Sequence, residues 1–458
     1  MDTKALRQKI LDLAIHGKLV PQDPNDEPAS VLLERIRAEK ERLIKEGKIK
    51  KGKKSAKTSD KPHYPYELPK GWCFTNIGEL LINRDGERKP VSSAIRSKQS
   101  NKIYDYYGAA GIIDKIDDYL FDEKLLLIGE DGANLLSKRK NNAFFAKGKY
   151  WVNNHAHVLD ATDKKLLEYV AIVINAIKLD DYITGSAQPK LSQDNLNKIP
   201  IALPPLSEQK RIMEAIIHWS LLIEQIEQNK IDLQASIKQA KSKVLDLAIH
   251  GKLVPQDPND EPAIELLKRI NPKAEIITDN GHYQKLPVGW CEVWLGEIFN
   301  HNTGKALNTS NTEGIMRKYL TTSNVYWNTF DFTTVKQMYF KNNELDKCSI
   351  TKGDLLVCEG GDIGRAAIWN YDYNICIQNH LHRLRPKING LCVSFYYYVF
   401  NYLKVNNMIG GKGIGLLGLS SNALHKLHVP FPSLAEQTRI AAKIEELFHQ
   451  LDMIEESL

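Results

Sequence analysis

The sequence of 458 residues lacks the motifs that mark a self-contained enzyme. It has no Walker A loop, no H-E-x-x-H zinc motif and no G-x-S-x-G nucleophile elbow. The Asn/Asp-Pro-Pro-aromatic loop of amino-methyltransferases is missing as well. We therefore expect no catalytic residue in this chain.

Long apolar runs and paired cysteines are also absent. No apolar run approaches the ~20 residues that a helix needs to cross a bilayer. Charges interrupt the N-terminal stretch MDTKALRQKILDLA, where a signal peptide would be apolar. The six cysteines form no C-x-x-C pair, which suits a reducing compartment better than a disulfide framework. These absences argue against a membrane span and favour the cytoplasm.

What is present is the composition of a globular protein long enough for two or three domains. Hydrophobic residues make up 42% of the chain and charged residues 26%, both ordinary shares for a protein folded in water. The formal net charge of +6 is compatible with a nucleic-acid partner, but taken alone it discriminates little.

Two motifs resemble ligand sites and are better explained otherwise. Residues 413–418 spell G-x-G-x-x-G, but the strand that precedes a dinucleotide site is missing. Two H-x-H pairs, His155/His157 and His380/His382, would place imidazoles on one strand face, but no third and fourth ligand lies at a useful spacing. We predict no metal site. The histidines should donate hydrogen bonds within half-buried strands or, as the second interpretation, face a groove.

The strongest positive signal is a repeat with a period above 200 residues. The nineteen residues LDLAIHGKLVPQDPNDEPA occur unchanged at Leu11–Ala29 and at Leu245–Ala263, and we name each copy a joint. LPKGWC at Leu68–Cys73 matches LPVGWC at Leu286–Cys291. Solenoid repeats have periods of about 20–50 residues, so this pattern indicates a duplicated domain with a connector. A further match joins Leu191–Ile212 to Leu419–Ile440.

Each globular segment is followed by a helix with coiled-coil spacing. Beyond Ile212, apolar residues recur at alternating steps of four and three for about five heptads, with Lys230 as a polar interruption. The second connector starts in the same way and stops halfway, and its missing half matches the N-terminus of the chain. The predicted seam comprises Ile212, Ile216, Trp219, Ile223, Ile226, Leu233 and Ile237 in the first connector, Ile440, Ile444, Leu447, Leu451 and Ile454 in the second, and Leu6, Ile10 and Leu13 at the N-terminus.

A central helix that runs from the first domain to the second requires the split helix to return from the second to the first. We therefore predict a mixed α/β (α+β) fold: two α/β domains separated by a long antiparallel two-helix coiled coil and related by a pseudo-two-fold axis. The alternative is that each helix packs on its own domain, although five heptads exceed what one small domain buries. The predicted segments are an N-terminal helix (1–20), a helix with a basic linker (21–67), the first domain (68–204), the central helix (205–251), a helix with a linker (252–285), the second domain (286–431) and the C-terminal helix (432–458).

This layout resembles the specificity (S) subunit of type I restriction–modification enzymes over essentially the whole chain. The resemblance depends on the L-P-x-G-W domain openings, the L-S-x-x-x-L…P-x-L-x-E-Q domain exits and the repeated joint with its long helices. It implies two target-recognition domains that each read one half of a split site in double-stranded DNA, and two methyltransferase (M) subunits docked alongside. It also implies that restriction (R) subunits join the full complex, that S-adenosylmethionine, ATP and Mg²⁺ bind partner subunits, and that this chain binds no cofactor.

Polar loop residues beside strands are the candidates for DNA contacts. Lys and Arg hold phosphates without discrimination, whereas Asn, Gln, Arg, Ser and Thr read base edges. Each candidate is equally compatible with a solvated surface side chain. The candidates are Gly132, Asn134, Lys138, Arg139, Asn141 and Asn142 in the first domain, and Lys305, Ser323, Asn324, Arg365 and Lys412 in the second.

Two other classes of protein stay open at this point. One is a self-contained DNA methyltransferase or nuclease with duplicated recognition domains, against which the missing catalytic loops speak. The other is a coiled-coil scaffold that does not bind DNA. Binding to duplex DNA with a steep salt dependence separates a recognition protein from such a scaffold.

Overall fold

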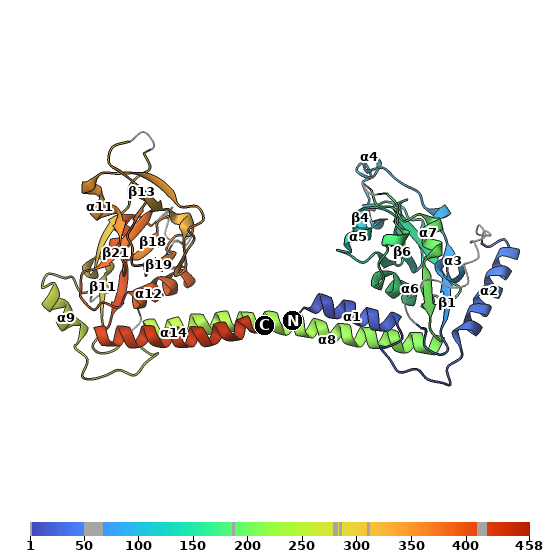
Figure 1. Ribbon diagram of the computed structural model, residues 1–458, viewed down its shortest axis with the longest axis horizontal. Helices are drawn as coiled ribbons and strands as arrows, with labels where there is room; N and C mark the ends of the chain where they lie inside the picture. Colours follow the sequence, from blue (N-terminus) through green and yellow to red (C-terminus); the bar gives the residue numbers. More distant parts are fainter. Residues whose placement is uncertain are drawn as a thin grey trace. The chain divides into compact units, whose positions relative to one another are not determined.

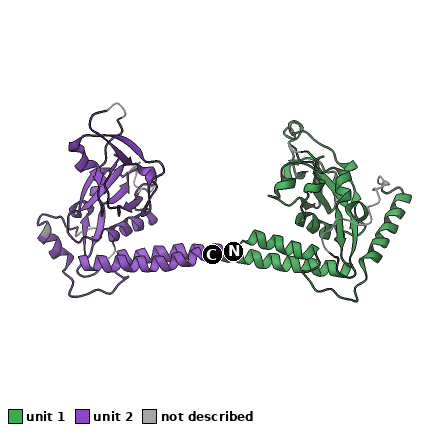
Figure 2. Cartoon of the chain, in the orientation of Figure 1, with its two compact units in different colours: residues 1–229 green, residues 230–458 purple. Residues whose placement is uncertain are grey.

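The computed structural model describes residues 2–49, 67–185, 188–277, 283, 286–308, 312–409 and 419–458. The chain folds into two compact units, residues 1–229 and 230–458, and the boundary between them lies inside helix α8 (Leu206–Ile249) (Figure 2). Most of the predicted basic linker, the glycine-rich motif at 413–418 and the candidate Lys412 lie outside the described residues.

Among its described residues, unit 1 forms two four-stranded sheets and a two-stranded one. Their strand orders are β2-β9-β6-β7, β4-β3-β8-β5 and β1-β10. Strands β3 and β8 pair in parallel, whereas β6 pairs antiparallel with both of its neighbours. The strands are β1 (Cys73–Asn76), β2 (Ile82–Asn83), β3 (Tyr104–Gly108), β4 (Gly111–Ile116), β5 (Phe121–Asp122), β6 (Leu125–Gly129), β7 (Ala143–Ala146), β8 (Lys149–Val152), β9 (Ala156–Asp160) and β10 (Pro200–Leu203).

The run LLLIG forms strand β6, and it is apolar throughout because both faces of this strand are buried. Leu126 and Ile128 pack into the core that contains helix α6, whereas Leu125 and Leu127 pack into the core between the two larger sheets. A strand buried on both sides carries no alternating polar residue. The helices of unit 1 are α1 (Thr3–Ile15), α2 (Ala29–Lys45), α3 (Ile77–Leu80), η1 (Asp85–Glu87), α4 (Ser93–Arg96), α5 (Asn134–Ser137), α6 (Lys165–Ala176), η2 (Asp180–Tyr182) and α7 (Gln193–Lys198).

Unit 2 repeats this topology with different surface elements. Its described strands form sheets in the orders β12-β21-β18-β19, β16-β13-β20-β17 and β11-β22, and a hairpin β14-β15 is added. Here β13 and β20 form the parallel pair. The strands are β11 (Cys291–Trp294), β12 (Phe299–Thr303), β13 (Ile315–Leu320), β14 (Val325–Tyr326), β15 (Thr329–Phe330), β16 (Lys336–Phe340), β17 (Ser349–Ile350), β18 (Leu355–Cys358), β19 (Ala366–Ile368), β20 (Ile375–Ile377), β21 (Leu381–Pro386) and β22 (His428–Phe431).

A nearly all-apolar helix covers the first sheet of each unit and meets a connector helix. In unit 1, α6 packs against α1, and in unit 2, α12 packs against α14, where Tyr398 and Phe448 have ring centroids 5.8 Å apart (Figure 1). The mixed α/β fold predicted for each half of the chain and the long central helix are confirmed. The remaining helices of unit 2 are α9 (Ala263–Ile270), α10 (Leu295–Ile298), η3 (Thr322–Asn324), α11 (Asn342–Cys348), α12 (Val393–Val405), α13 (Ser421–His425) and α14 (Leu434–Glu456).

None of the helices in the described part of the chain combines the length and the apolarity that crossing a bilayer requires.

Candidate nucleic-acid interface

The joint contains the end of a helix and then turns sharply away from it. In unit 1, His16 Nδ1 donates to the Asp12 carbonyl oxygen (2.6 Å) at the last turn of α1. Gly17 follows with a φ of +65°, and a Cβ atom at this position would overlap the Pro69 side chain. The left-handed conformation and the close contact both favour glycine. The turn therefore requires the glycine of the joint, because the chain packs here against Pro69 of the L-P-x-G-W segment.

A buried carboxylate connects the joint to the opening and the exit of the domain. Glu208, in the first turn of α8, is 1% exposed. It accepts hydrogen bonds from Trp72 Nε1 (2.9 Å) and from Gln22 Nε2 (3.1 Å). A buried carboxylate is strongly unfavourable unless its oxygens are bonded, and the N-terminal end of a helix favours negative charge. We name this set of contacts the clamp of unit 1.

Two further contacts complete the clamp. Asp26 of the joint forms an ion pair with Arg211 on α8 through both carboxylate oxygens (2.6 and 3.3 Å). The hydrogen bond from this guanidinium lowers the pKa of the Asp26 carboxyl. The Ala29 N–H, at the start of α2, donates to the Gly71 carbonyl oxygen (2.8 Å). Joint, domain and helix are thus fastened at four points around one buried centre.

The clamp of unit 2 repeats these contacts at matching positions. Glu436 on α14 is 3% exposed and accepts from Trp290 (2.8 Å) and Gln256 (2.5 Å). Burial raises the pKa of the Glu436 carboxyl, and the two donors offset only part of this rise. The matching glutamine, aspartate and histidine side chains of the two joints therefore meet matching partners. The other contacts are His250 to the Asp246 carbonyl (2.7 Å), Arg439 to Asp260 (2.7 and 3.2 Å) and the Ala263 N–H to the Gly289 carbonyl (2.8 Å).

A shorter helix runs antiparallel to α8 within each unit. In unit 1 this helix is α1 and in unit 2 it is α14. Lys230, the polar residue in the predicted seam, donates to the last carbonyl oxygen of the chain, where a helix C-terminus favours a cation. The contacts that set the antiparallel order are Arg7–Glu227 (3.1 Å) and Gln22–Glu208 (3.1 Å) in unit 1, and Lys241–Asp452 (2.5 Å) and Lys230 Nζ to the Leu458 carbonyl (2.6 Å) in unit 2.

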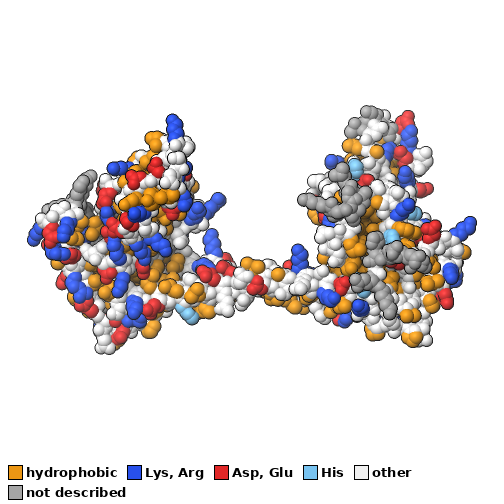
Figure 3. Space-filling view, turned by 180° about the vertical axis from the view of Figure 1, so that it is seen from behind, with side chains coloured by type: hydrophobic (Ala, Val, Ile, Leu, Met, Phe, Trp, Pro, Cys, Tyr) orange, Lys and Arg blue, Asp and Glu red, His pale blue; other side chains and the backbone are white. Residues whose placement is uncertain are grey.

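One column of the predicted seam on α8 is buried and the other is open. Ile223 and Ile237 are 1% and 3% exposed, whereas Trp219, Ile226 and Leu233 are 44%, 39% and 40% exposed. A single partner helix covers only one side of α8, so the second column faces solvent together with other apolar residues (Figure 3). Elsewhere in the seam, Ile212, Ile440, Ile444 and Ile10 are buried, Ile216, Leu447, Leu451, Leu6 and Leu13 are half-buried, and Ile454 is exposed.

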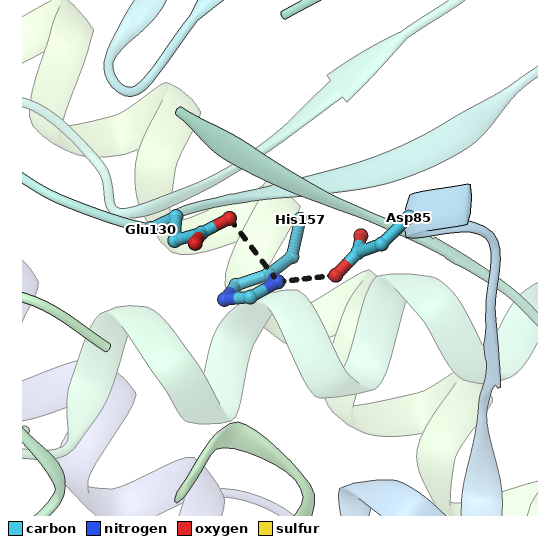
Figure 4. Close-up of side chains that lie close together, drawn as sticks. All are labelled: Asp85, Glu130 and His157. Carbon is cyan, nitrogen blue, oxygen red and sulfur yellow. Dashed lines mark hydrogen bonds and ion pairs between the residues drawn. The ribbon is translucent and has the colours of Figure 1, made fainter. Parts of the chain in front are cut away.

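His157 lies in a buried ion network in unit 1 (Figure 4). Its Nε2 donates to the Leu191 carbonyl oxygen (2.8 Å), and its Nδ1 lies 2.6 Å from Asp85 and 3.9 Å from Glu130. Arg88 contacts both carboxylates, at 2.7 Å from Glu130 and 3.4 Å from Asp85. Burial raises the pKa of Asp85, but the hydrogen bond and charge of His157, with the charge of Arg88, outweigh it and leave that pKa below its ordinary value.

This network anchors the exit of the domain and is a poor metal site. Asp85, Glu130 and His157 are close enough to share an ion. Arg88 already neutralises the carboxylates, and Lys190 adds a second cation 3.3 Å from Glu130. The ring of His157 donates from strand β9, which is buried except at its last residue, whereas His155 precedes the strand and is exposed.

His382 takes the matching place in unit 2 with a different partner. Its Nε2 donates to the Leu419 carbonyl oxygen (2.7 Å), so its Nδ1 accepts from His301 Nε2, 2.9 Å away. Burial, reinforced by His382, His425 and Arg383, lowers the pKa of His301 to about 4. Both rings of the pair are neutral in this arrangement.

We expect unit 2 to lose stability as the pH falls from 6.5, the ordinary pKa of histidine, to about 4. Over this range the unfolded chain binds a proton at His301 that the folded unit resists, and stability falls with pH wherever the unfolded state binds more protons. The unfolding temperature of unit 2 should drop by a few degrees, measured by calorimetry. His301→Gln should flatten this drop, and the control His380→Gln, at an exposed ring, should not. An equal drop in the His301 variant would contradict the assignment.

The first-domain candidates gather in the loop between β6 and β7, and several of them hold that loop together. Asn142 is 2% exposed and donates to a backbone carbonyl of the loop (3.0 Å), and Asn134 donates to the Asn142 side chain (2.8 Å). Lys138 donates to carbonyl oxygens at the end of α6. The side-chain donors of these three residues are therefore used within the protein, and few remain for DNA. Arg139 and Asn141 are exposed, and Gly132, with a φ of +99°, has open space beside it.

Three of the second-domain candidates lie together, because Arg365 contacts the backbone directly before Ser323 and Asn324. Asn324 is fully buried and fastens a turn, and Lys305 forms an ion pair with Glu344 (2.6 Å). Arg365 donates to a backbone carbonyl (2.7 Å) and lies over the Tyr326 ring (5.1 Å). These contacts serve the fold of the domain. Ser323 is exposed, and Lys412 lies outside the described residues.

The structure thus defines a protein with two unlike α/β domains, each held by the same clamp on a helical frame. Residues 69–237 and 287–458 both match the family described as the type I restriction modification DNA specificity domain. The chain belongs to this family.

Known relatives agree over almost the whole length. The type I restriction enzyme EcoAI specificity subunit of Escherichia coli is 28% identical over an alignment that covers 97% of this chain and 88% of the relative. The EcoEI specificity subunit of the same species is 26% identical, covering 99% and 90%. The crystal structure of the HsdS subunit from Thermoanaerobacter tengcongensis is similar in fold, with a TM-score of 0.53 and 16% identity over 86% of this chain and 93% of that one. The chain is a non-catalytic DNA-recognition subunit of a type I restriction–modification system.

Proposed function

We propose that each domain of this chain reads one half of a bipartite, asymmetric site in double-stranded DNA. The observation that supports this most directly is the duplicated clamp: identical contacts hold two domains whose surface elements differ. A constant frame with variable surfaces is what recognition of two different half-sites requires. The candidates for base and phosphate contacts remain part of this proposal, foremost the exposed Arg139, Asn141 and Ser323, and also Lys412.

We also propose that α8 pairs with α1 and α14 as an antiparallel two-helix coiled coil, which relates the two domains by a pseudo-two-fold axis. The antiparallel contacts within each unit support this arrangement. Duplex DNA has local dyads, so a two-fold protein can present two reading surfaces about one helical turn (~34 Å) or more apart. With 44 residues and ~1.5 Å per residue, α8 has a length of about 66 Å and can set this spacing.

The open column of α8 supports a proposal about assembly. Trp219 and Ile226 in unit 1 and Leu233 in unit 2 are large apolar side chains left exposed on a helix. Exposed apolar patches often mark interaction sites, and tryptophan is enriched where binding energy concentrates. We propose that two methyltransferase subunits dock here. S-adenosylmethionine, ATP and Mg²⁺ then belong to the methyltransferase and restriction subunits, and the complex acts on DNA in the cytoplasm.

Methylome sequencing of a host that expresses this chain with its methyltransferase partner tests the proposal. The expected result is one split motif with methylated adenine in both halves and an unread gap between them. A continuous motif, or methylation that does not depend on this chain, would contradict it. Methyl transfer from S-adenosylmethionine by the isolated chain would instead support a self-contained enzyme. A lack of salt-dependent binding to duplex DNA would support a scaffold.

A further inference from the structure

A groove opens in unit 2 where two neighbouring parallel strands separate. Strand β13 pairs with β20 only through Tyr319 and Leu320, so the first half of β13 leaves β20. The space beside it reaches α11 and the start of β17 and has a volume of about 810 Å³. Figure 1 shows β13 and α11 at the end of unit 2 that is remote from α14.

Hydrogen-bond donors dominate the lining of this groove. Arg317 and Lys318 line it from β13, Gln337 from β16 and Asn374 from the residue before β20. One carboxylate, Asp346, is among the lining side chains. Arg317 and Lys318 are both exposed and form no ion pair within the described residues. The groove therefore carries two cations that nothing in the described chain neutralises, which favours an anionic ligand.

The strand of unit 1 that matches β13 is identified by the parallel pairing of each unit. In unit 1, Tyr106 lies opposite Trp151, and in unit 2, Tyr319 lies opposite Cys376. Trp151 and Cys376 each stand six residues before the second histidine of an H-x-H pair. The two tyrosines therefore occupy matching positions, and so do the two residues that precede each of them.

At these matching positions the two units carry different chemistry. Unit 1 has Tyr104 and Asp105, whereas unit 2 has Arg317 and Lys318. Asp105 forms an ion pair with Lys115 at 3.7 Å. The charges therefore cancel at this position in unit 1, whereas the matching surface of unit 2 is cationic. The scaffold is shared and the exposed chemistry is not.

We propose that this groove is the surface with which unit 2 reads its half of the DNA site, an inference that rests on the proposed function. Lys318 and Gln337 lie directly opposite each other in the β13–β16 register and so share one face of the sheet. From this face they read base edges in the major groove, since an ammonium group donates to guanine and an amide pairs with adenine. Arg317 lies on the other face of β13, because successive strand residues alternate, and holds a phosphate. The different side chains of unit 1 at the same position give that domain a different half-site.

The test uses the complex of this chain with its methyltransferase partner and the duplex that carries its methylated motif. Lys318→Ala and Gln337→Ala should each weaken binding to this duplex roughly 10- to 100-fold and relax the second half of the motif alone. Arg317→Ala should weaken binding to the target and to an unrelated duplex alike, and lower the salt slope by about 1. The control Lys336→Ala, at an exposed neighbour of Gln337 outside the groove lining, should change neither.

The outcomes separate this inference from the proposed function. If the unaltered complex binds a split site and the Lys318 and Gln337 variants behave like the Lys336 control, the groove is not the reading surface and the proposed function stands. If both variants weaken binding to all duplexes equally and leave the motif unchanged, the groove contacts only the DNA backbone, and the proposal that it reads bases fails. If the unaltered complex binds no duplex specifically, the proposed function fails as well. Unchanged unfolding temperatures show that the variants are folded.

Discussion

Trp72→Ala should destabilise unit 1 by about 4 kcal/mol, the usual cost of removing a large buried aromatic side chain. The ring is 8% exposed, and its indole N–H is bonded to the buried Glu208 carboxylate. The variant therefore leaves a cavity and a carboxylate that has lost a donor. The unfolding temperature of unit 1, measured by calorimetry, should fall by roughly 10 °C. In the complex, the half of the motif read by unit 1 should no longer be recognised.

Two controls separate the clamp from a general effect of losing tryptophan. Trp72→Phe keeps an aromatic ring and removes the donor, so it should cost about 2 kcal/mol, the usual penalty for an unsatisfied buried acceptor. Trp219→Ala removes an exposed tryptophan of the same unit and should leave the stability of the isolated chain within about 0.5 kcal/mol. If Trp72→Ala unfolded no earlier than Trp219→Ala, the clamp would not stabilise the unit.

Aspartate at both Trp219 and Ile226 should lower adenine methylation by the complex more than 100-fold while the chain stays folded. Both side chains are exposed on α8, so charges there cost the isolated chain little. At the centre of an interface, two such residues typically contribute about 2 kcal/mol or more each. Size-exclusion chromatography of the chain with its methyltransferase partner measures the loss of assembly directly.

The matched control is Gln225→Asp, an exposed residue of the same helix on another face. This variant should assemble and methylate like the unaltered chain. A double variant at Trp219 and Ile226 that still formed the full complex would show that the open column of α8 is not the docking surface.

The sequence predicts the frame better than the sites, for a physical reason. The repeated joint, the L-P-x-G-W openings and the E-Q exits identify the residues of the clamp, because identical contacts preserve identical side chains. The contacts themselves cannot be predicted from the sequence, since the hydrogen bond between Trp72 and Glu208 joins residues that are 136 positions apart. The heptad pattern likewise predicts apolar positions on α8 but not which column a partner helix covers.

A polar side chain in a loop is the sequence feature that predicts DNA contacts, but structural residues share this feature. Asn and Lys in turns often satisfy backbone carbonyls, as Asn142 and Lys138 do. This feature also does not identify Arg317 and Lys318, which lie within a strand. Their exposure follows from the separation of β13 from β20, and that is a tertiary feature without a local sequence signal.

Replacing residues 286–431 with a second copy of residues 68–203 tests most directly whether two unlike domains read two halves of one site on a two-fold frame. The clamp contacts of unit 2 are kept, because both domains bring the same opening and exit residues to the joint. The methylome of a host that expresses this variant with the methyltransferase partner should show the first half-site as an inverted repeat across the gap. Retention of the original asymmetric motif would contradict reading by separate domains, and a direct repeat would contradict the two-fold frame.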